Sequence, residues 1–128
     1  MTSAKLPPPA QLLGAYAVIF ISQRVVVGPG VGQDAGPADA ETDGYGTTAD
    51  RMVELAAQQP GYLGIQSSRG ADGLGITVSY WQTLADISHW RAQAEHTLAR
   101  QHGRERWYES YELQIAKIDR AYDWQRED

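Results

Sequence analysis

Two of the three histidines, His89 and His96, stand seven residues apart in a stretch with helical periodicity. Seven residues are close to two helical turns, so the two imidazoles would lie within about 20° of each other around a helix. An imidazole beside a cleft can act as an acid, a base or an iron ligand near neutral pH. His96 is therefore our candidate catalytic base and His89 a candidate substrate-binding residue, with a surface position as the alternative for both. No third histidine or carboxylate follows at a convincing spacing, so no metal site is predicted.

Aromatic residues surround these histidines, with Trp90 next to His89, and Trp107 and Tyr108 further along. Flat aromatic side chains stack well on a flat organic ligand. Trp90 is therefore a candidate for the catalytic site, and Trp107 and Tyr108 are candidates for substrate binding, with the hydrophobic core as the alternative. Arg104 could pair with an acidic group of the substrate, or form an exposed ion pair with a neighbouring glutamate.

Other catalytic signatures are missing from the sequence. There is no glycine-rich phosphate loop between a strand and a helix, and no Gly-x-Ser-x-Gly elbow. The chain has no cysteine, which excludes disulfides, thiolate metal sites and a cysteine nucleophile. Flavin or nicotinamide binding therefore has no support.

The composition is that of one globular domain, with 128 residues of which 42% are hydrophobic and 21% charged. The net charge of -5 argues against nucleic acid or an anionic membrane as the main partner. No apolar run approaches the length of a membrane span, and the three prolines near the start are unlike a signal peptide. We expect a cytoplasmic protein that acts on a small molecule.

Hydrophobic periodicity predicts the elements that must position these side chains. A helix is expected to start at Thr83, a good N-cap, and to end near Gly103. The last strand changes the parity of its apolar positions after Ile115, which predicts a bulge or a bend there. The expected elements are strand 15–21, helix 47–59, strand 62–69, strand 76–81, helix 84–102 and strand 111–122.

Three segments fall outside the periodic pattern. Residues 1–13 contain three successive prolines, which favour an extended conformation, and are predicted to be a flexible N-terminal arm. Residues 28–46 hold six glycines and are predicted to be a loop insertion, either mobile or an ordered lid. Residues 124–128 are expected to be a charged tail, which leaves 14–123 as the folded domain.

The order strand, helix, strand, strand, helix, strand predicts a ferredoxin-like α+β fold with an antiparallel sheet and both helices on one face. The first strand is apolar on both faces, which indicates a sheet that is covered on both sides. The chain has too few elements to cover the second face. We therefore expect a homodimer whose sheets face each other, with Tyr16, Ile19 or Phe20 at or near the interface.

The sequence resembles the antibiotic biosynthesis monooxygenase (ABM) superfamily of dimeric α+β barrel proteins, which includes the heme-degrading monooxygenases. The stretches that carry the resemblance are AVIFISQR, MVELAAQQPGYLGIQSSRGADGLGITVSYW, HWRAQAEH and GRERWY. The resemblance covers about residues 15 to 123. It implies the dimeric α+β barrel fold and a site between sheet and helices.

In the heme-degrading branch, a tryptophan on the second long helix presses on the porphyrin, and Trp90 matches it. That branch places its iron-ligating histidine where this sequence has Arg100. It places an asparagine on the first strand where this sequence has Ser22 and Gln23, and the resemblance makes these two residues candidates for substrate binding.

Three functional hypotheses remain open. The first is a small ABM-type monooxygenase that oxidises an aromatic or polyketide-like substrate with O2 and no bound organic cofactor. The second is heme binding with oxidative degradation of the heme. The third is a dimeric small-molecule-binding protein that uses the same cavity without turnover.

Overall fold

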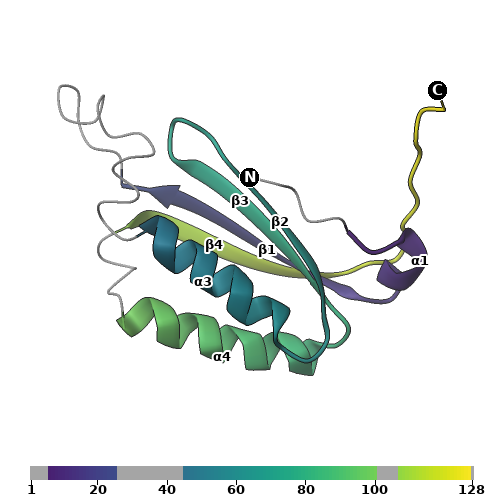
Figure 1. Ribbon diagram of the computed structural model, residues 1–128, viewed down its shortest axis with the longest axis horizontal. Helices are drawn as coiled ribbons and strands as arrows, with labels where there is room; N and C mark the ends of the chain where they lie inside the picture. The colour runs from purple at the N-terminus through teal and green to yellow at the C-terminus, as the bar shows by residue number, and fades with distance from the viewer. Residues whose placement is uncertain (1–5, 26–44, 101–106, 128) are drawn as a thin grey trace.

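The computed structural model describes residues 6–25, 45–100 and 107–127. Four strands form one antiparallel sheet in the order β2-β3-β1-β4, and the two long helices α3 and α4 both lie on one face of it (Figure 1). Apart from the short α1, the element order confirms the predicted ferredoxin-like α+β fold. In chain order the elements are α1 (Pro9–Leu12), β1 (Tyr16–Arg24), α3 (Tyr45–Ala57), β2 (Tyr62–Arg69), β3 (Leu74–Trp81), α4 (Leu84–Arg100) and β4 (Tyr108–Lys117).

β1 lies inside the sheet, between β3 and β4, and pairs with both. Val18 stands opposite Ser79 of β3, and the side chains of directly opposite residues point to the same face. The inner face, which the helices cover, therefore carries Val18 and Phe20 of β1. The outer face carries Ile19 and Ile21. β1 therefore places apolar side chains on both faces of the sheet.

The hydrophobic core lies between the inner face and the long helices. Its centre is Trp81, which is fully buried and whose indole Nε1 donates a hydrogen bond to Ser79 Oγ at 2.9 Å. That bond satisfies a buried N–H group that would otherwise destabilise the core. The buried residues of this cluster are Val18, Ala56, Trp81, Ile87 and Trp90.

The start of α4 is fixed by a capping interaction and by the turn that precedes β2. Thr83 is the N-cap, as predicted: its Oγ1 accepts a hydrogen bond from Asp86 N at 3.1 Å and donates one to Asp86 Oδ2 at 2.8 Å. Gly61 packs directly against this cap, with a φ of 80°, and a Cβ at its position would lie 1.9 Å from Asp86 Oδ2. Its carbonyl also accepts a hydrogen bond from Gln82 N at 2.9 Å. The close approach leaves room only for glycine.

The N-terminal arm predicted for residues 1–13 contains a short helix, which corrects the extended conformation expected there. Pro8 is at the N-cap of α1 and Pro9 is at its first position. A proline suits that position because its φ is already helical and its missing N–H would have no partner in the helix. The helix is held to the domain by Leu12, which is buried.

β4 begins at Tyr108, before the predicted start at residue 111, and ends at Lys117. Its register with β1 is continuous over residues 110–117, so there is no bulge after Ile115, and the bend that was the alternative stays a prediction. The register shifts instead between Gln23 and Arg24 of β1. Ile115 is 41% exposed, so its apolar character is a poor guide to the faces of this edge strand.

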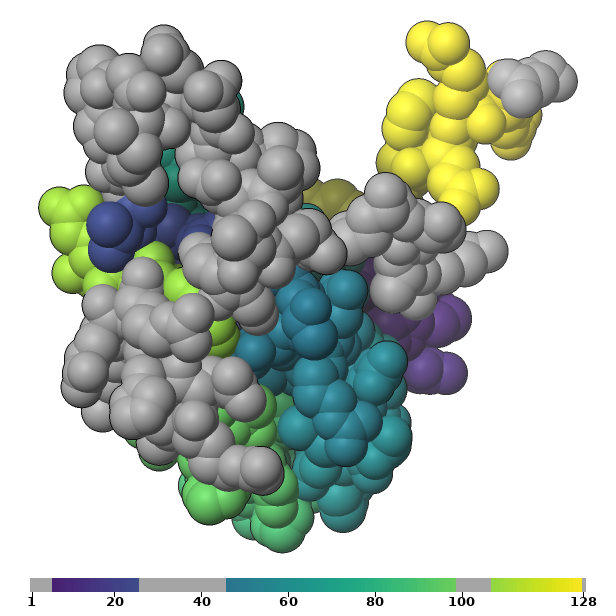
Figure 2. Space-filling model, turned by 60° about the vertical axis from the view of Figure 1, so that its left-hand side comes forward, coloured from purple at the N-terminus to yellow at the C-terminus, as the bar shows by residue number. Residues whose placement is uncertain are grey.

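Residues 118–127 have no regular secondary structure and extend away from the sheet; they are the yellow segment of Figure 1 and Figure 2. They carry two large aromatic side chains in water, Tyr122 with 87% and Trp124 with 81% of its surface exposed. Among the helices that the structure describes, none combines the length and the apolar character that crossing a membrane would require.

Candidate functional site

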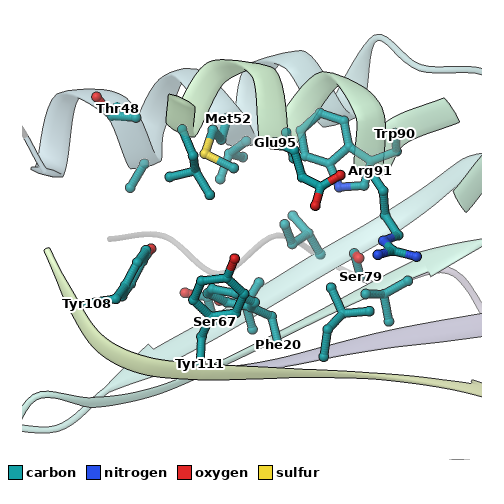
Figure 3. Close-up of a pocket in the computed structure, with 18 of the residues that line it drawn as sticks. Phe20, Thr48, Met52, Ser67, Ser79, Trp90, Arg91, Glu95, Tyr108 and Tyr111 are labelled. Atoms are coloured by element: carbon teal, nitrogen blue, oxygen red, sulfur yellow. The ribbon is translucent and has the colours of Figure 1, made fainter. Parts of the chain in front are cut away.

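A cavity of about 230 Å³ lies between the inner face of the sheet and helices α3 and α4. Figure 3 shows side chains from both layers pointing into it. Most of its walls are apolar or aromatic, with a few polar groups, as is typical of sites for organic molecules. The lining residues are Val18, Phe20, Thr48, Ala49, Met52, Val53, Ile65, Ser67, Thr77, Ser79, Trp90, Arg91, Ala94, Glu95, Leu98, Trp107, Tyr108, Tyr111 and Leu113.

The floor of the cavity follows from the register of the strands. Ser67 of β2 is opposite Thr77 of β3, Thr77 is opposite Phe20 of β1, and Phe20 is opposite Leu113 of β4. These four side chains form one row across the whole sheet, because opposite residues share a face. The row places hydroxyl groups on the β2 and β3 side of the floor and apolar groups on the β1 and β4 side.

The roof is formed by α3 and α4, and its largest aromatic side chain is Trp90. The Trp90 ring stacks on Trp81, with the ring centroids 5.9 Å apart and the planes at 21°. Tyr62 in turn packs edge-on against Trp81 at 5.7 Å, and burial raises the pKa of the Tyr62 hydroxyl. Only 8% of the Trp90 surface is exposed. The Trp90 ring is therefore held by the core while it also lines the cavity.

One end of the cavity is walled by aromatic rings from β1 and β4. Phe20 lies 5.7 Å from Tyr108 and 5.3 Å from Tyr111, and the two tyrosines are 5.7 Å apart, all measured between ring centroids. Trp107, just before β4, is buried and lines the same cavity. Three mutually contacting rings fix one another, so this end is a preformed surface on which a flat ligand could pack.

Two charged side chains of α4, Arg91 and Glu95, also line the cavity. They are four residues apart, about one helical turn, so they project from the same side of the helix. In Figure 3 the Glu95 carboxylate and the Arg91 guanidinium are both directed from α4 toward the sheet, the latter on the side of Ser79. The roof therefore presents a hydrogen-bond acceptor and a hydrogen-bond donor beside apolar walls.

The aromatic residues selected from the sequence are brought together here. Trp90, Trp107 and Tyr108, which are well separated in the sequence, all line the cavity. Their parts in catalysis and substrate binding stay predictions. Arg104, the fourth candidate from the same stretch, lies outside the described residues.

Ser22 and Gln23 are not among the lining residues. Ser22 is buried, and its Oγ accepts a hydrogen bond from Arg69 Nη2 at 2.8 Å. Gln23 Nε2 donates to the backbone oxygen of Asp72 at 2.8 Å, which ties β1 to the β2–β3 turn. In the structure both side chains stabilise the sheet, and substrate binding by them stays a prediction.

The two described histidines lie on α4 with exposed side chains, and neither His89 nor His96 is among the lining residues. The helix positions that reach the cavity include Trp90, which immediately follows His89, and Glu95, which immediately precedes His96. The catalytic role of His96 therefore stays a prediction. No group of three or more histidine, cysteine, aspartate or glutamate side chains suited to a metal ion occurs within residues 6–25, 45–100 and 107–127.

Sequence reasoning did not select Glu95 or the floor hydroxyls of Ser67 and Thr77 as site residues. Arg91 could have been selected from the sequence, because the helical pattern places it on the apolar side of the helix together with Ala94. Ser67 and Thr77 could be assigned to the floor only once the register with Phe20 was known.

The sheet, the two helices on one face and the cavity between them define a ferredoxin-like α+β protein with a largely apolar internal cavity. The sequence model of the antibiotic biosynthesis monooxygenase family matches residues 37–102, and the chain belongs to this family. The uncharacterized protein YqjZ of Bacillus subtilis (strain 168) is 51% identical over 106 residues, which cover 82% of this chain and 80% of YqjZ.

Solved structures with this fold include two at low sequence identity. SnoaB, a cofactor-independent oxygenase from Streptomyces nogalater, aligns with a TM-score of 0.58 and 12% identity, over 82% of this chain and 93% of its own. PA3566 from Pseudomonas aeruginosa also aligns with a TM-score of 0.58, at 15% identity, over 84% of this chain and 96% of its own. At 12% and 15% identity, these two comparisons show a shared fold and nothing further.

Proposed function

We propose that this protein is an ABM-type monooxygenase that oxidises an electron-rich aromatic substrate with O2 inside the cavity, without a bound organic cofactor. The observation that carries the proposal is the aromatic, largely apolar cavity between sheet and helices, with Trp90 fixed in its roof by stacking on Trp81. Membership of the ABM family supports it, as does the shared fold with SnoaB, which is a cofactor-independent oxygenase.

The substrate itself supplies the electrons in such a reaction. Loss of a proton from an activated CH2 group gives a carbanion, which passes electrons to O2 and forms a C–OOH group. The hydroperoxide loses water to give a C=O group, so one oxygen atom enters the product and the other leaves as water. A protein promotes these steps by removing the proton and by holding the anion away from bulk water.

The residues of the cavity suit the second of these tasks. The rings of Phe20, Tyr108 and Tyr111 and the indole of Trp90 provide flat surfaces that orient the substrate and exclude water from it. The hydroxyls of the floor are available to bind oxygen atoms of the substrate. For the first task, the base that the sequence predicts is His96. Its side chain is exposed and lies outside the lining, so the variant His96→Ala tests this prediction separately from the cavity.

Heme binding was one of the two alternatives that the sequence left open, and the described residues do not fit it. A cavity of about 230 Å³ lies below the roughly 300–1,000 Å³ of sites for drug-sized ligands, and a porphyrin is no smaller than those ligands. Neither described histidine lines the cavity. We therefore derive no step through heme.

We also propose that the protein works as a homodimer in which the outer faces of two sheets meet. On that face Ile76 and Leu74 are 44% and 43% exposed, and Ile19 and Ile21 lie beside them on β1. A second copy would remove this apolar surface from water. Of the residues predicted for the interface, Ile19 faces outward. Tyr16 and Phe20 instead face the helices, so the interface proposed here uses Ile19.

The experiment for the proposed function is oxygen uptake by purified protein treated with a chelator and free of heme absorbance. Anthrone and a dihydroxynaphthalene are the substrates, and uptake without protein is subtracted. We expect uptake above this background and, with isotopically labelled O2, one labelled oxygen atom in the anthrone product. Saturable hemin binding followed by loss of the heme spectrum under reductant would favour the heme reaction, and ligand binding without O2 uptake would favour a binding protein.

A further inference from the structure

The hydroxyl group of Ser79 is a buried hydrogen-bond donor that faces the cavity. Ser79 is 5% exposed and lines the cavity from β3, and Figure 3 shows its oxygen directed from the sheet toward the helices. The residues in the same row across the sheet are apolar: Ile65 on β2, Val18 on β1 and Ile115 on β4. Ser79 therefore places one polar group in an otherwise apolar row.

A hydrogen bond from Trp81 sets the direction of this donor. The Trp81 indole Nε1 donates to Ser79 Oγ at 2.9 Å, and an indole N–H can only donate. The bond occupies one lone pair of the oxygen, so the hydroxyl hydrogen must point away from Trp81. Trp81 is itself held by its stack on Trp90, with the ring centroids 5.9 Å apart. The core therefore orients the Ser79 donor beside the aromatic roof of the cavity.

No acceptor in the described part of the chain takes this hydrogen. Within residues 6–25, 45–100 and 107–127, the bond from Trp81 is the one hydrogen bond of the Ser79 side chain, and there Ser79 is the acceptor. A ligand that displaces water from a buried donor without offering an acceptor binds less tightly than one that offers it. Sites of this kind discriminate strongly against analogues that lack the matching oxygen.

Ser79 differs from the other serine and threonine residues of the described lining. Ser67 is exposed and Thr77 is half-buried, so water reaches both hydroxyls. Thr48 on α3 is buried, but in Figure 3 its oxygen points away from the sheet. A hydrogen bond that only replaces one to water adds little affinity, whereas an unmatched buried donor weakens binding. The hydroxyl of Ser79 should therefore distinguish most sharply between ligands with and without an acceptor.

Resting on the proposed function, we propose that Ser79 binds the carbonyl oxygen of the substrate and stabilises the enolate formed from it. When a base removes a proton from the CH2 group beside that carbonyl, the C–H electron pair forms a C=C bond. The π pair of the C=O bond moves to the oxygen, which becomes an oxyanion. The proton goes to the base, and Ser79 keeps its own. A hydrogen bond to a charged oxygen is stronger than one to a neutral carbonyl, so Ser79 stabilises the anion more than the ketone.

Tetralone and tetralin test the binding step by isothermal titration calorimetry. They share a two-ring skeleton, and tetralone adds a carbonyl beside a CH2 group. A cavity of about 230 Å³ has room for either compound, since about 150 Å³ is known to hold benzene. We expect the native protein to bind tetralone at least about fivefold more tightly than tetralin, the effect of one net hydrogen bond. Ser79→Ala should remove this preference, and Ser79→Thr, which keeps the hydroxyl, should retain it.

Further variants separate hydrogen bonding from packing. Ser79→Cys keeps a side chain of similar size but only a weak donor, so it should lose the preference as Ser79→Ala does. Ser68→Ala is the control, because it removes a hydroxyl from an exposed position of β2 outside the lining. Thr77→Val removes another hydroxyl of the lining, and a preference lost in that variant but kept in Ser79→Ala would assign the carbonyl to Thr77 and overturn the proposal.

Naphthol tests the stabilisation of the anion, because its neutral and ionised forms absorb differently. The apparent pKa of bound naphthol should be about one unit higher in Ser79→Ala than in the native protein, since the oxyanion loses a hydrogen bond. If Ser79 serves only to satisfy the Trp81 N–H group, the substitution will leave this pKa unchanged. That result would refute the role in enolate stabilisation.

Equal affinities for tetralone and tetralin in the native protein would overturn the proposal, as would a preference that survives in Ser79→Ala and Ser79→Cys. Saturable binding of neither compound would overturn it too. Circular dichroism establishes that each variant is folded. None of these titrations depends on O2 uptake, so a preference that requires Ser79 in a protein without oxygenase activity would refute the proposed function and leave the Ser79 site standing. Uptake together with a preference independent of Ser79 would do the reverse.

Discussion

Gly61→Ala is expected to lower the free energy of unfolding by about 1.5–4 kcal/mol, although it adds a single methyl group. Part of the loss, about 1–2 kcal/mol, comes from forcing a side chain into left-handed backbone, since φ at Gly61 is 80°. The rest comes from the new Cβ, which would lie 1.9 Å from Asp86 Oδ2 and would push Asp86 off Thr83. Loss of such a cap destabilises a helix by about 0.5–2 kcal/mol.

Gly14→Ala is the matched control for this substitution. Gly14 has a similar φ of 77°, and a Cβ there would have nothing within 4 Å. It should therefore show the backbone contribution alone, about 1–2 kcal/mol. Urea unfolding followed by tryptophan fluorescence gives both values, and the near-ultraviolet circular dichroism of Gly61→Ala reports whether the Trp81–Trp90 stack has moved with α4.

The reasoning fails if the two glycine variants lose the same stability, because the contact with Asp86 would then contribute nothing. A second comparison uses the double variant. Since Asp86→Ala removes the group that the new methyl would strike, Gly61→Ala should be less harmful in the Asp86→Ala background than in the native one. Additive losses would contradict the proposed clash.

Three further predictions concern the site and the interface. Trp90→Ala should lower the free energy of unfolding by about 3–5 kcal/mol, as for other buried aromatic residues, and should weaken ligand binding. Urea unfolding measures the first effect and calorimetry the second. A loss of stability below about 1 kcal/mol would show that the stack on Trp81 does not stabilise the fold. His96→Ala should abolish O2 uptake and change the free energy of unfolding by no more than about 0.5 kcal/mol, because the side chain is exposed; undiminished uptake would remove His96 from the mechanism. Ile19→Lys should convert a dimer to a monomer in light scattering at micromolar concentration, whereas a native protein that is already monomeric would refute the proposed interface.

Local chemistry made much of the fold predictable. β2 runs from Tyr62 to Arg69 in the structure, the same bounds that the sequence predicts, because a glycine-rich turn follows an alternating segment. The N-cap at Thr83 was equally readable, since a threonine three residues before an aspartate fits a capping pattern. The helix that begins at Pro9 could not be predicted, because successive prolines are compatible both with an extended arm and with the start of a helix.

The site was harder to predict than the fold because it depends on which face each residue occupies. Aromatic residues can be selected as site candidates by residue type alone, and Trp90, Trp107 and Tyr108 do line the cavity. A charged residue on a helix is usually exposed to solvent, so Glu95 was not selected and its neighbour His96 was preferred. Successive residues are about 100° apart around a helix, so the neighbour of a residue that lines the cavity can point into the solvent.

The measurement that tests the central claim most directly is O2 uptake by a variant in which the cavity is filled. Ala94 lines the cavity on α4, whereas Ala92 on the same helix is exposed and outside the lining. Ala94→Trp should abolish the uptake seen with the native protein, and Ala92→Trp should retain it, both in folded protein. Equal uptake by the two variants would contradict the claim that oxidation takes place in this cavity.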